Sequence, residues 1–591
     1  MKPMKTLTIG TTTYEVVDKV AREQAGSGGG GSAEYNRINV RDYGAVGDGV
    51  TDDRAAIITA FDKAKTMLPC EVYFPAGTYG IGNGITVEME YGTGGLLVRG
   101  AGRDITTIKY LESYDPNQPG NMWYAIRIWP VGRPNTAPAT EDEYLHDISI
   151  TGLSVYDTDP VAHAWNTANG DPSTEETHGF DIHYCKRVSV TDCSILNVGD
   201  EGVDIYSCRD VIVANNHLAG SPAAGASGGA ISIGDGSVGV LVSGNTVNGR
   251  LLDGVVNNPK GNFGIAVESL KIPVRDVVIE GNIVRNVQGN GINIAATNAG
   301  SGLYNINITD NLIQGCNNGI RDEGTHPRDG VKISGNTFVD CVVDETIGSD
   351  LSGFAITLNY PYTALLVQGN TIRNTHGNYA VRLNCGDNPV LFSDNVLENI
   401  GKAAMYTGTN VIVRDCVITN TGVEDATSTA AIIPATATCK LRVYGCQMTG
   451  VRQTRAIHNA TEVEDTAMEL VGADGNRVTD ANVLGGNLLE RVVNCRFDGN
   501  ITIAKDNALV QGNTITSSQG WAHAIAVNAS GVMVSGCHIT QTDVSKGKRA
   551  IGENTGKNHN LFIGNVCNTE IVTVGDKTVS ANNINTSAAT T

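Results

Sequence analysis

Short stretches in which apolar and polar residues alternate dominate this chain. The pattern glycine, apolar, variable, apolar occurs twice within His178–Tyr206, first at Gly179–His183 and again at Gly202–Tyr206. It returns, with Gly or Ala in first place, at Ala230–Ile233, Gly264–Val267, Gly291–Ile294, Gly319–Arg321, Ala355–Leu358, Ala380–Leu383, Ala431–Ile433, Ala456–His458, Ala524–Val527 and Ala550–Gly552. Because successive side chains of a strand point to opposite faces, this alternation predicts many short β-strands. Helix signals are nearly absent in the repeats.

A second pattern of two apolar residues around a variable one leads to a recurring Asn or Cys. These positions are Cys193, Asn216, Asn245, Asn282, Asn311, Asn336, Asn370, Asn395, Cys416, Cys446, Cys495, Asn513, Cys537 and Asn565. Their mean spacing of ~29 residues indicates a solenoid whose stacked coils share one core. Stacking predicts that the asparagines form amide ladders, and that the cysteines replacing them are small buried fillers.

The strand alternation directs Phe180 and Ile182 into the core and Asp181 and His183 outward. The same holds one coil later, where Asp204 and Tyr206 face outward. Since equivalent residues stack, we expect Asp181 near Asp204 and His183 near Tyr206. The outer columns continue, as a polar stripe that could hold a long polysaccharide, at Ser232, Glu268, Asn293, Arg321, Glu323, Asn359, Arg382 and Asn384.

Two stacked carboxylates cannot both stay ionised without a compensating group. One outcome is a raised pKa and acid–base catalysis, at a spacing that suits a retaining glycosidase. Another is a Ca²⁺ site formed by Asp181 and Asp204, with Asp200 or Glu201 adding oxygens. The third is neutralisation by a nearby cation, for which the sequence offers Lys186 or Arg209. The residues alone leave these three outcomes open.

Composition limits the classes of partner. The chain has 591 residues and a net charge of −20, which argues against nucleic acid and against an anionic membrane surface. Its 13 cysteines are odd in number and lack clustered short spacings, so no disulfide framework is expected, and the absence of CxxC argues against a zinc site. No run is long and apolar enough to predict a membrane span, and residues 1–24 lack the apolar segment of a secretory signal. Synthesis in a cytoplasm is therefore expected.

The chain begins with a segment that differs from the repeats. Within residues 1–24, Leu7 and Ile9 alternate before a turn near Gly10, and Asp18 could cap a short helix. This segment is too small to fold alone, so we expect it to dock onto its own copies or a larger assembly. A Gly/Ser-rich tether follows; an engineered tag and linker is the alternative for residues 1–32.

The remaining organisation follows from where the repeats are regular. We predict an anchor at 1–24, a linker at 25–37, a β-helical domain at 38–575 and a C-terminal tail at 576–591. Within the domain we expect a capping region (38–108), long loops (109–178), regular coils (179–452), an irregular insertion (453–490) and final coils (491–575). In the capping region a helix from Asp53 to about Met67, with Asp52 or Thr51 as N-cap, would cover the open end of the first coil.

The segment Asp42–Asp53, DYGAVGDGVTDD, resembles the opening of the pectate-lyase superfamily. That resemblance implies an all-β, right-handed, single-stranded parallel β-helix, most like a bacteriophage tailspike or polysaccharide depolymerase. It also implies a homotrimer. Residues 5–24 resemble the short N-terminal segment of phage structural proteins, which implies location on the virion and attachment to other virion proteins.

Gly179–His183 also resembles the G-F-D-P-H-E site of mannuronan epimerases. By that resemblance Asp181 and His183 take the places of the family's Asp and His, whereas Ile182 and Tyr184 depart from its Pro and Glu. The implied chemistry is that of uronates. His183 would take a C5 proton, Asp181 would help neutralise a substrate carboxylate, and Tyr206 would return a proton.

Further residues are candidates for substrate binding. Arg321–Glu323 forms with Glu268 either a glycosidase site or an ion network, and we favour the network. Asp322 falls at an inward position, so it either forces a turn or pairs internally. Tryptophans 123, 129, 165 and 521 could stack on sugars or pack in the core. The predicted substrate-binding set is His178, Trp165, Glu268, Asn293, Arg321, Glu323 and Arg382.

Three functions are consistent with these features. The leading hypothesis is a virion spike or fibre that binds, and could degrade, host cell-surface polysaccharide. The first alternative is a structural or adhesive virion protein without catalysis. The second is a free polysaccharide lyase or epimerase. No cofactor other than Ca²⁺ is indicated.

Overall fold

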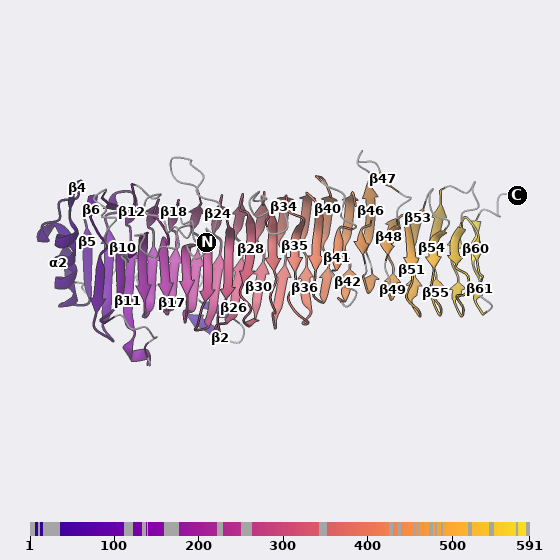
Figure 1. Ribbon diagram of the computed structural model, residues 1–591, viewed down its shortest axis with the longest axis horizontal. Helices are drawn as coiled ribbons and strands as arrows, with labels where there is room; N and C mark the ends of the chain where they lie inside the picture. The colour runs from indigo at the N-terminus through magenta and orange to yellow at the C-terminus, as the bar shows by residue number, and fades with distance from the viewer. Residues whose placement is uncertain are drawn as a thin grey trace, which may run out of the picture. The chain divides into compact units, whose positions relative to one another are not determined.

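The structure is a computed structural model in which strands dominate (Figure 1). It describes residues 6–9, 12–15, 36–111, 122–132, 138, 140–158, 176–220, 229–249, 263–341, 352–424, 430–434, 439–453, 455–458, 460–464, 466–471, 477–478, 482–485, 489–517, 523–542, 549–574 and 577–586. These residues divide into two compact units, one formed by residues 1–282 and 298–307, the other by residues 283–297 and 308–591. The predicted domain 38–575 therefore spans two units. Both consist of three-strand coils.

A coil of the first unit shows how the sequence pattern becomes structure. β13 (Glu176–His183), β14 (Cys185–Thr191) and β15 (Ser194–Leu196) follow one another, and each pairs in parallel with its equivalent in the next coil. Those equivalents are β16 (Val203–Tyr206), β17 (Arg209–Ala214) and β18 (His217–Ala219). Three stacked parallel sheets result. The predicted right-handed parallel β-helix is confirmed.

The second unit repeats this arrangement. β35 (Tyr379–Leu383), β36 (Val390–Ser393) and β37 (Val396–Ile400) pair in parallel with β38 (Ala403–Thr407), β39 (Val411–Arg414) and β40 (Val417–Thr421). Apolar residues at alternate positions, such as Val381 and Leu383, are fully buried. Strands this short gain their stability from the shared core rather than from their own hydrogen bonds.

The recurring asparagines form the predicted ladders. In the first unit, Asn216 donates through Nδ2 to Asn245 Oδ1 at 3.0 Å, and Asn245 donates in the same way to Asn282. Each Oδ1 also accepts a backbone amide of the preceding coil. The residue before the asparagine adopts a left-handed conformation, as at Gly244 (φ 63°), which is why Gly, Asn or Asp precedes it. The second unit has the same ladder at Asn311, Asn336, Asn370 and Asn395.

The cysteines behave as predicted. All 13 are buried and none forms a disulfide. Cys193 and Cys537 stand at ladder positions, where their backbone amides are accepted by Asn216 Oδ1 and Asn565 Oδ1. A thiol therefore fills the space of an amide side chain, while an asparagine of the neighbouring coil still accepts the hydrogen bond of the backbone amide.

Helix α2 (Arg54–Lys65) packs against β3 (Asn36–Asn39), β5 (Cys70–Phe74) and β7 (Thr86–Met89) in the first unit (Figure 1). It buries a stripe of apolar residues at Ile57, Ala60, Phe61 and Ala64. The helix is shorter than predicted. Asp53 is its N-cap residue, while the Asp52 carboxylate accepts the Arg54 amide at 3.0 Å. The described part of the chain contains no helix long and apolar enough to cross a membrane.

Three regions differ from the sequence interpretation. Within residues 109–178, predicted as long loops, β10 (Met122–Pro130), β11 (Leu145–Thr151) and β12 (Ser154–Tyr156) form a coil. Glu462–Glu464, within the predicted irregular insertion 453–490, is strand β45, which pairs with the coils on either side. The tail continues the stack through β61 (Val579–Ala581) and β62 (Ile584–Asn585). Strands β45, β61 and β62 have only two or three residues each and are too short to stand out in the sequence.

At the N-terminus, β1 (Thr6–Ile9) and β2 (Thr12–Glu15) form the predicted antiparallel hairpin, with Leu7 opposite Tyr14. The predicted helix after Asp18 and most of the linker lie outside the described residues.

Candidate functional site

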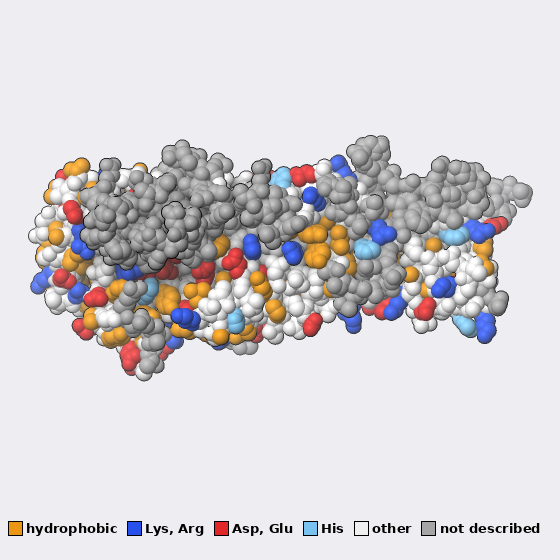
Figure 2. All heavy atoms as spheres, in the orientation of Figure 1, with side chains coloured by type: hydrophobic (Ala, Val, Ile, Leu, Met, Phe, Trp, Pro, Cys, Tyr) orange, Lys and Arg blue, Asp and Glu red, His pale blue; other side chains and the backbone are white. Residues whose placement is uncertain are grey.

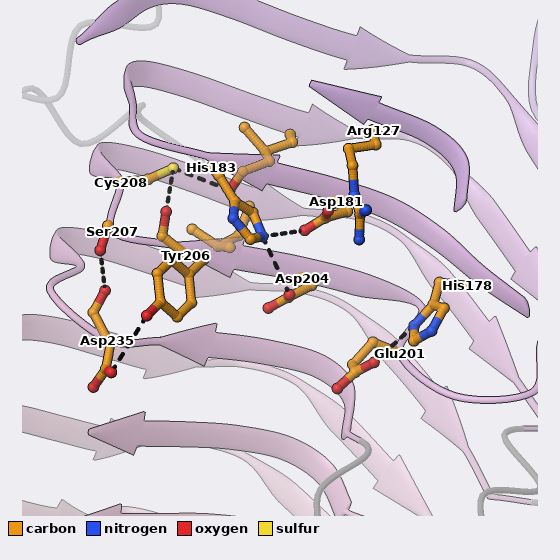
Figure 3. A network of polar contacts seen from close by, with 12 residues as sticks. Arg127, His178, Asp181, His183, Glu201, Asp204, Tyr206, Ser207, Cys208 and Asp235 are labelled. Carbon is orange, nitrogen blue, oxygen red and sulfur yellow. Dashed lines mark hydrogen bonds and ion pairs between the residues drawn. The ribbon is translucent and has the colours of Figure 1, made fainter. Parts of the chain in front are cut away.

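The candidate site lies on one sheet of the first unit, where β10, β13 and β16 run side by side (Figure 3). The register places Arg127, Asp181 and Asp204 at equivalent positions of three successive coils. His183 and Tyr206 pair two residues further along. The predicted stacking of Asp181 on Asp204 and of His183 on Tyr206 is thus observed.

Asp181 is a fully buried carboxylate held by two cations. Arg127 Nε donates to Asp181 Oδ2, and His183 Nε2 forms an ion pair with Asp181 Oδ1 at 2.6 Å. Burial alone would raise the pKa of Asp181, but His183 and Arg127 outweigh it and lower that pKa to about 2. The sequence interpretation placed Asp181 at the solvent face. The structure shows it buried, because a cation and aromatic rings pack over this outer face.

Aromatic rings enclose the cations. The Arg127 guanidinium lies 3.5 Å from the centre of the Tyr124 ring and 4.3 Å from that of Trp129. The rings of His183 and Tyr206 are stacked with centres 4.8 Å apart. These contacts fix the orientation of both cations and exclude water from Arg127, so the ion pairs act in a medium of lower polarity than the surface.

His183 lies between two carboxylates, since its Nε2 is also 3.8 Å from Asp204 Oδ2. Burial would lower the pKa of His183, but Asp181 and Asp204 raise it to about 10. Burial raises the pKa of Asp204 and the charge of Asp181 adds to the rise, partly opposed by His183. The side chains of His183 and Asp204 are 16% and 19% exposed, against 0% for Asp181, so they are the members of the cluster that a ligand can reach.

These pKa values favour a role for His183 that differs from the one implied by the epimerase resemblance, and they add a role for Asp204. At neutral pH the His183 imidazole is protonated, so it is a proton donor or an anion-binding group rather than a base. Tyr206 also holds its proton, because burial and the nearby Asp235 raise its pKa to about 12. Asp204 is the group whose raised pKa suits proton exchange with a substrate.

The cations expected from the sequence pair elsewhere. Lys186 donates to the Glu141 carbonyl at 2.6 Å, and Arg209 forms an ion pair with the Glu141 carboxylate. Arg127, which sequence reasoning missed, neutralises Asp181 instead. A signal was present, because Ala125–Ile128 repeats the pattern alanine, apolar, variable, apolar that marks the strands of this sheet.

The four predicted Ca²⁺ ligands do not form one cluster. Asp181 and Asp204 group with His183, whereas Asp200 and Glu201 group with His178. His178 Nδ1 lies 2.7 Å from Glu201 Oε2. Both oxygens of Asp181 are engaged by cations, which leaves the first group poorly suited to a metal ion.

The other predicted residues occupy separate places. Ser232 pairs with Asp204 in the first unit, and Asn293, Arg321, Thr357 and Arg382 form one column in the second. Arg321 Nε is 3.9 Å from Glu323 Oε1, while Glu268 belongs to the first unit. The role of these residues in substrate binding stays a prediction.

Asp322 pairs internally, which was one of the two predicted outcomes. Its carboxylate accepts the Asn359 amide at 2.7 Å and the Tyr362 hydroxyl at 3.1 Å. Burial raises its pKa to about 6, opposed by Arg328 and these hydrogen bonds. Trp123 and Trp129 are buried, at 4% and 6% exposed, and Trp129 packs against Arg127; Trp165 and Trp521 lie outside the described residues.

Two family models match the chain in the region just described. Residues 37–122 match "Rhamnogalacturonase A/epimerase, pectate lyase-like" and residues 174–338 match "Right handed beta helix region". Over these two segments the chain is similar to pectate-lyase-like right-handed β-helices. The second match includes Asp181, His183 and Asp204.

The chain is also similar to parts of several known proteins. Mannuronan C5-epimerase AlgE4 of Azotobacter vinelandii is 41% identical over 83 residues, which cover 13% of this chain and 14% of that protein. Alginate lyase 7 of the same organism is 30% identical over 173 residues, covering 28% and 16%. The matched segments are thus a small part of both relatives. The N-terminal fragment of bacteriophage phi29 gene product 12 has 15% identity, a TM-score of 0.48 and coverage of 91% of each chain.

The coupled charges of the cluster predict how stability depends on pH. The pKa of His183 is about 10 in the folded protein against an ordinary 6.5, so its contribution is complete below pH 6.5 and is lost as pH rises through 10. The pKa of Asp181 is about 2 against an ordinary 3.8, so its contribution is complete above pH 3.8 and is lost as pH falls through 2.

We therefore expect stability from this pair to be greatest between pH 3.8 and 6.5. Urea-unfolding midpoints at a series of pH values up to about 10 should show an alkaline loss on the order of 4 kcal/mol in the wild type. The variant His183→Gln should not show the part of this alkaline loss of stability that comes from deprotonation of His183. Parallel alkaline profiles for the two proteins would show that His183 titrates as it does in the unfolded chain.

Proposed function

We propose that this β-helix binds a polysaccharide across β10, β13, β16 and β19 (Gly229–Gly234) and acts on it by acid–base chemistry. One observation carries the proposal: His183 and Asp204 form a partly exposed acid–base pair, and both have pKa values displaced from the ordinary range. Shifted pKa values in a cluster whose members are held in place by buried residues are a marker of a functional site.

The geometry assigns distinct roles. Asp204 exchanges a proton with the sugar, because it is reachable and burial, together with the charge of Asp181, raises its pKa. His183, as an imidazolium, binds developing negative charge or a substrate carboxylate. Asp181 and Arg127 position His183 without touching substrate, since both are buried. A parallel strand ladder suits a long polymer because equivalent positions recur at ~4.8 Å intervals along the stack.

Incubation of the protein with uronate and neutral polysaccharides, with and without EDTA, tests this proposal. Absorbance of unsaturated uronates, reducing ends and the epimer ratio by NMR would be followed together. We expect at least one product signal. Unsaturated products indicate a lyase, reducing ends without unsaturation a hydrolase, and an altered epimer ratio an epimerase. Absence of products with every polymer, including that of the host, would contradict the catalytic part.

A binding protein without catalysis is the second candidate. Arg127 and His183 pair with both oxygens of Asp181. A network of this kind can have a purely structural role, in which it holds three coils together. In the assay above, polysaccharide binding without products would favour this function.

The proposal also locates the protein on a phage virion, attached to other virion proteins through residues 1–24 and assembled as a homotrimer. The resemblance of residues 5–24 and the hairpin β1–β2, too small to fold alone, support it. On the face shown in Figure 2, charges of both signs are scattered, with no broad basic area among the described residues, in agreement with a partner other than nucleic acid. Light scattering should give three times the chain mass of 62.1 kDa, and removal of residues 1–32 should abolish incorporation into particles.

A further inference from the structure

A second cluster of metal-ligating residues lies beside the candidate site. His178 comes from β13, and Asp200 and Glu201 come from the turn between β15 and β16. One ligand atom from each residue lies within 4.8 Å of the other two. Figure 3 shows His178 and Glu201 directed toward each other and away from His183. All three residues belong to the first unit.

The histidine of this cluster is held in place. Its ring stacks on Tyr124 with centres 4.3 Å apart, and its backbone carbonyl accepts the Tyr110 hydroxyl at 2.7 Å. The His178 side chain is 2% exposed. Burying a polar imidazole in one orientation costs free energy unless the ring has a defined partner. The orientation of His178 toward Glu201 therefore indicates that these two side chains act together.

The turn that carries the carboxylates is tied to the same strand. The Asp200 amide donates to the Thr177 carbonyl at 3.0 Å, and the Gly179 amide donates to the Glu201 carbonyl at 2.9 Å. The hydrogen bonds therefore flank the His178 position. Asp200 is buried and the Glu201 side chain is 16% exposed, so the cluster is closed on the core side and accessible from outside.

We propose that His178, Asp200 and Glu201 bind a divalent transition-metal ion, of which Zn²⁺ is the test case. Imidazole with carboxylates suits Zn²⁺, whereas Ca²⁺ prefers six to eight oxygens, which this set does not offer. Ligand atoms around tetrahedral Zn²⁺ are ~3.3 Å apart, so modest side-chain rotation closes the observed spacing. One or more coordination positions are left for water or a ligand.

The site links β13 to the turn that leads into β16, the strand of Asp204. Metal binding would thus connect two coils through side chains at the edge of the proposed polysaccharide-binding face. The proposal does not depend on catalysis, because binding and stability can be measured without a substrate.

The test uses full-length protein stripped with EDTA and dialysed against defined Zn²⁺ concentrations, with metal counted by mass spectrometry. We expect about one Zn²⁺ per chain and a rise in melting temperature with Zn²⁺. His178→Ala and Glu201→Gln should each weaken binding by about 100-fold or more, since each removes a ligand. His217→Ala, on β18 and outside the cluster, should bind Zn²⁺ as the wild type does.

Circular dichroism of the stripped variants shows whether they are folded, and Glu201→Gln preserves side-chain shape should His178→Ala fail to fold. The variant Asp204→Asn changes the cluster of Asp181, His183 and Asp204 but not that of His178, Asp200 and Glu201, so it should retain Zn²⁺ binding. Equal Zn²⁺ affinity in wild type and Glu201→Gln would overturn the proposal. The proposal would also be overturned if the protein bound Ca²⁺, these substitutions abolished that binding, and Zn²⁺ did not compete for the site.

Discussion

Replacement of Asp181 by asparagine lowers the free energy of unfolding by about 3–5 kcal/mol, the expected result of leaving a buried cation without its carboxylate. Arg127 is only 8% exposed on its side chain and lies between the rings of Tyr124 and Trp129, so water cannot take the place of Asp181. His183 loses the main cause of its raised pKa at the same time. Urea-unfolding midpoints measure the loss, and the alkaline dependence should flatten with it.

Asp147→Asn is the matched control. Asp147 also pairs with one arginine and one histidine, Arg187 at 2.7 Å and His146 at 2.8 Å, but the Asp147 side chain is 45% exposed. Solvent screens this group, so the control should lose no more than about 1 kcal/mol. The double variant Asp181→Asn/Arg127→Gln should recover part of the stability. Equal losses for Asp181→Asn and Asp147→Asn would show that burial of the first pair has no energetic consequence.

Asp204→Asn is expected to reduce turnover of the polysaccharide about 10²–10⁴-fold, the usual effect of removing a general acid or base. An amide has nearly the shape of the carboxylate but cannot exchange a proton. Because Asp204 is 19% exposed and its contact to His183 is 3.8 Å, the substitution should leave the fold and polysaccharide binding largely unchanged. Rates at saturating polymer and binding by co-sedimentation separate the two effects.

Asp210→Asn, an exposed substitution on β17 in the neighbouring sheet, serves as the control and should keep full activity. Asp181→Asn should lose both activity and stability, which distinguishes a positioning residue from one that touches substrate. If Asp204→Asn turns over polymer within a few-fold of wild type, proton exchange occurs at another group and the assignment of Asp204 is wrong.

The coils were predictable because their determinants are local. Alternation within Phe180–His183 and Val203–Tyr206, together with the recurring asparagines, defines both the strand and its register against the next coil. Once the register is known, the contact of Asp181 with Asp204 follows. The same reasoning predicted that Cys193 and Cys537 are buried and form no disulfide.

The partner of Asp181 was not predictable in the same way. Arg127 lies 54 residues earlier, and loops of irregular length separate β10 from the coils that follow it. Sequence spacing then no longer indicates which strand stacks on which. Lys186 and Arg209 were nearer in sequence, yet their side chains contact Glu141 on a different part of the coil.

The type of coil, the ladder that joins successive coils and the columns in which side chains stand follow from the repeat, because each depends on a pattern of about one coil length. The burial of Asp181 under Arg127, and the division of the acidic residues 181, 200, 201 and 204 into two clusters, depend on the folded chain. Burial and pairing depend on which distant segments cover a face, and they set the pKa values that make His183 an acid and Asp204 the candidate proton carrier.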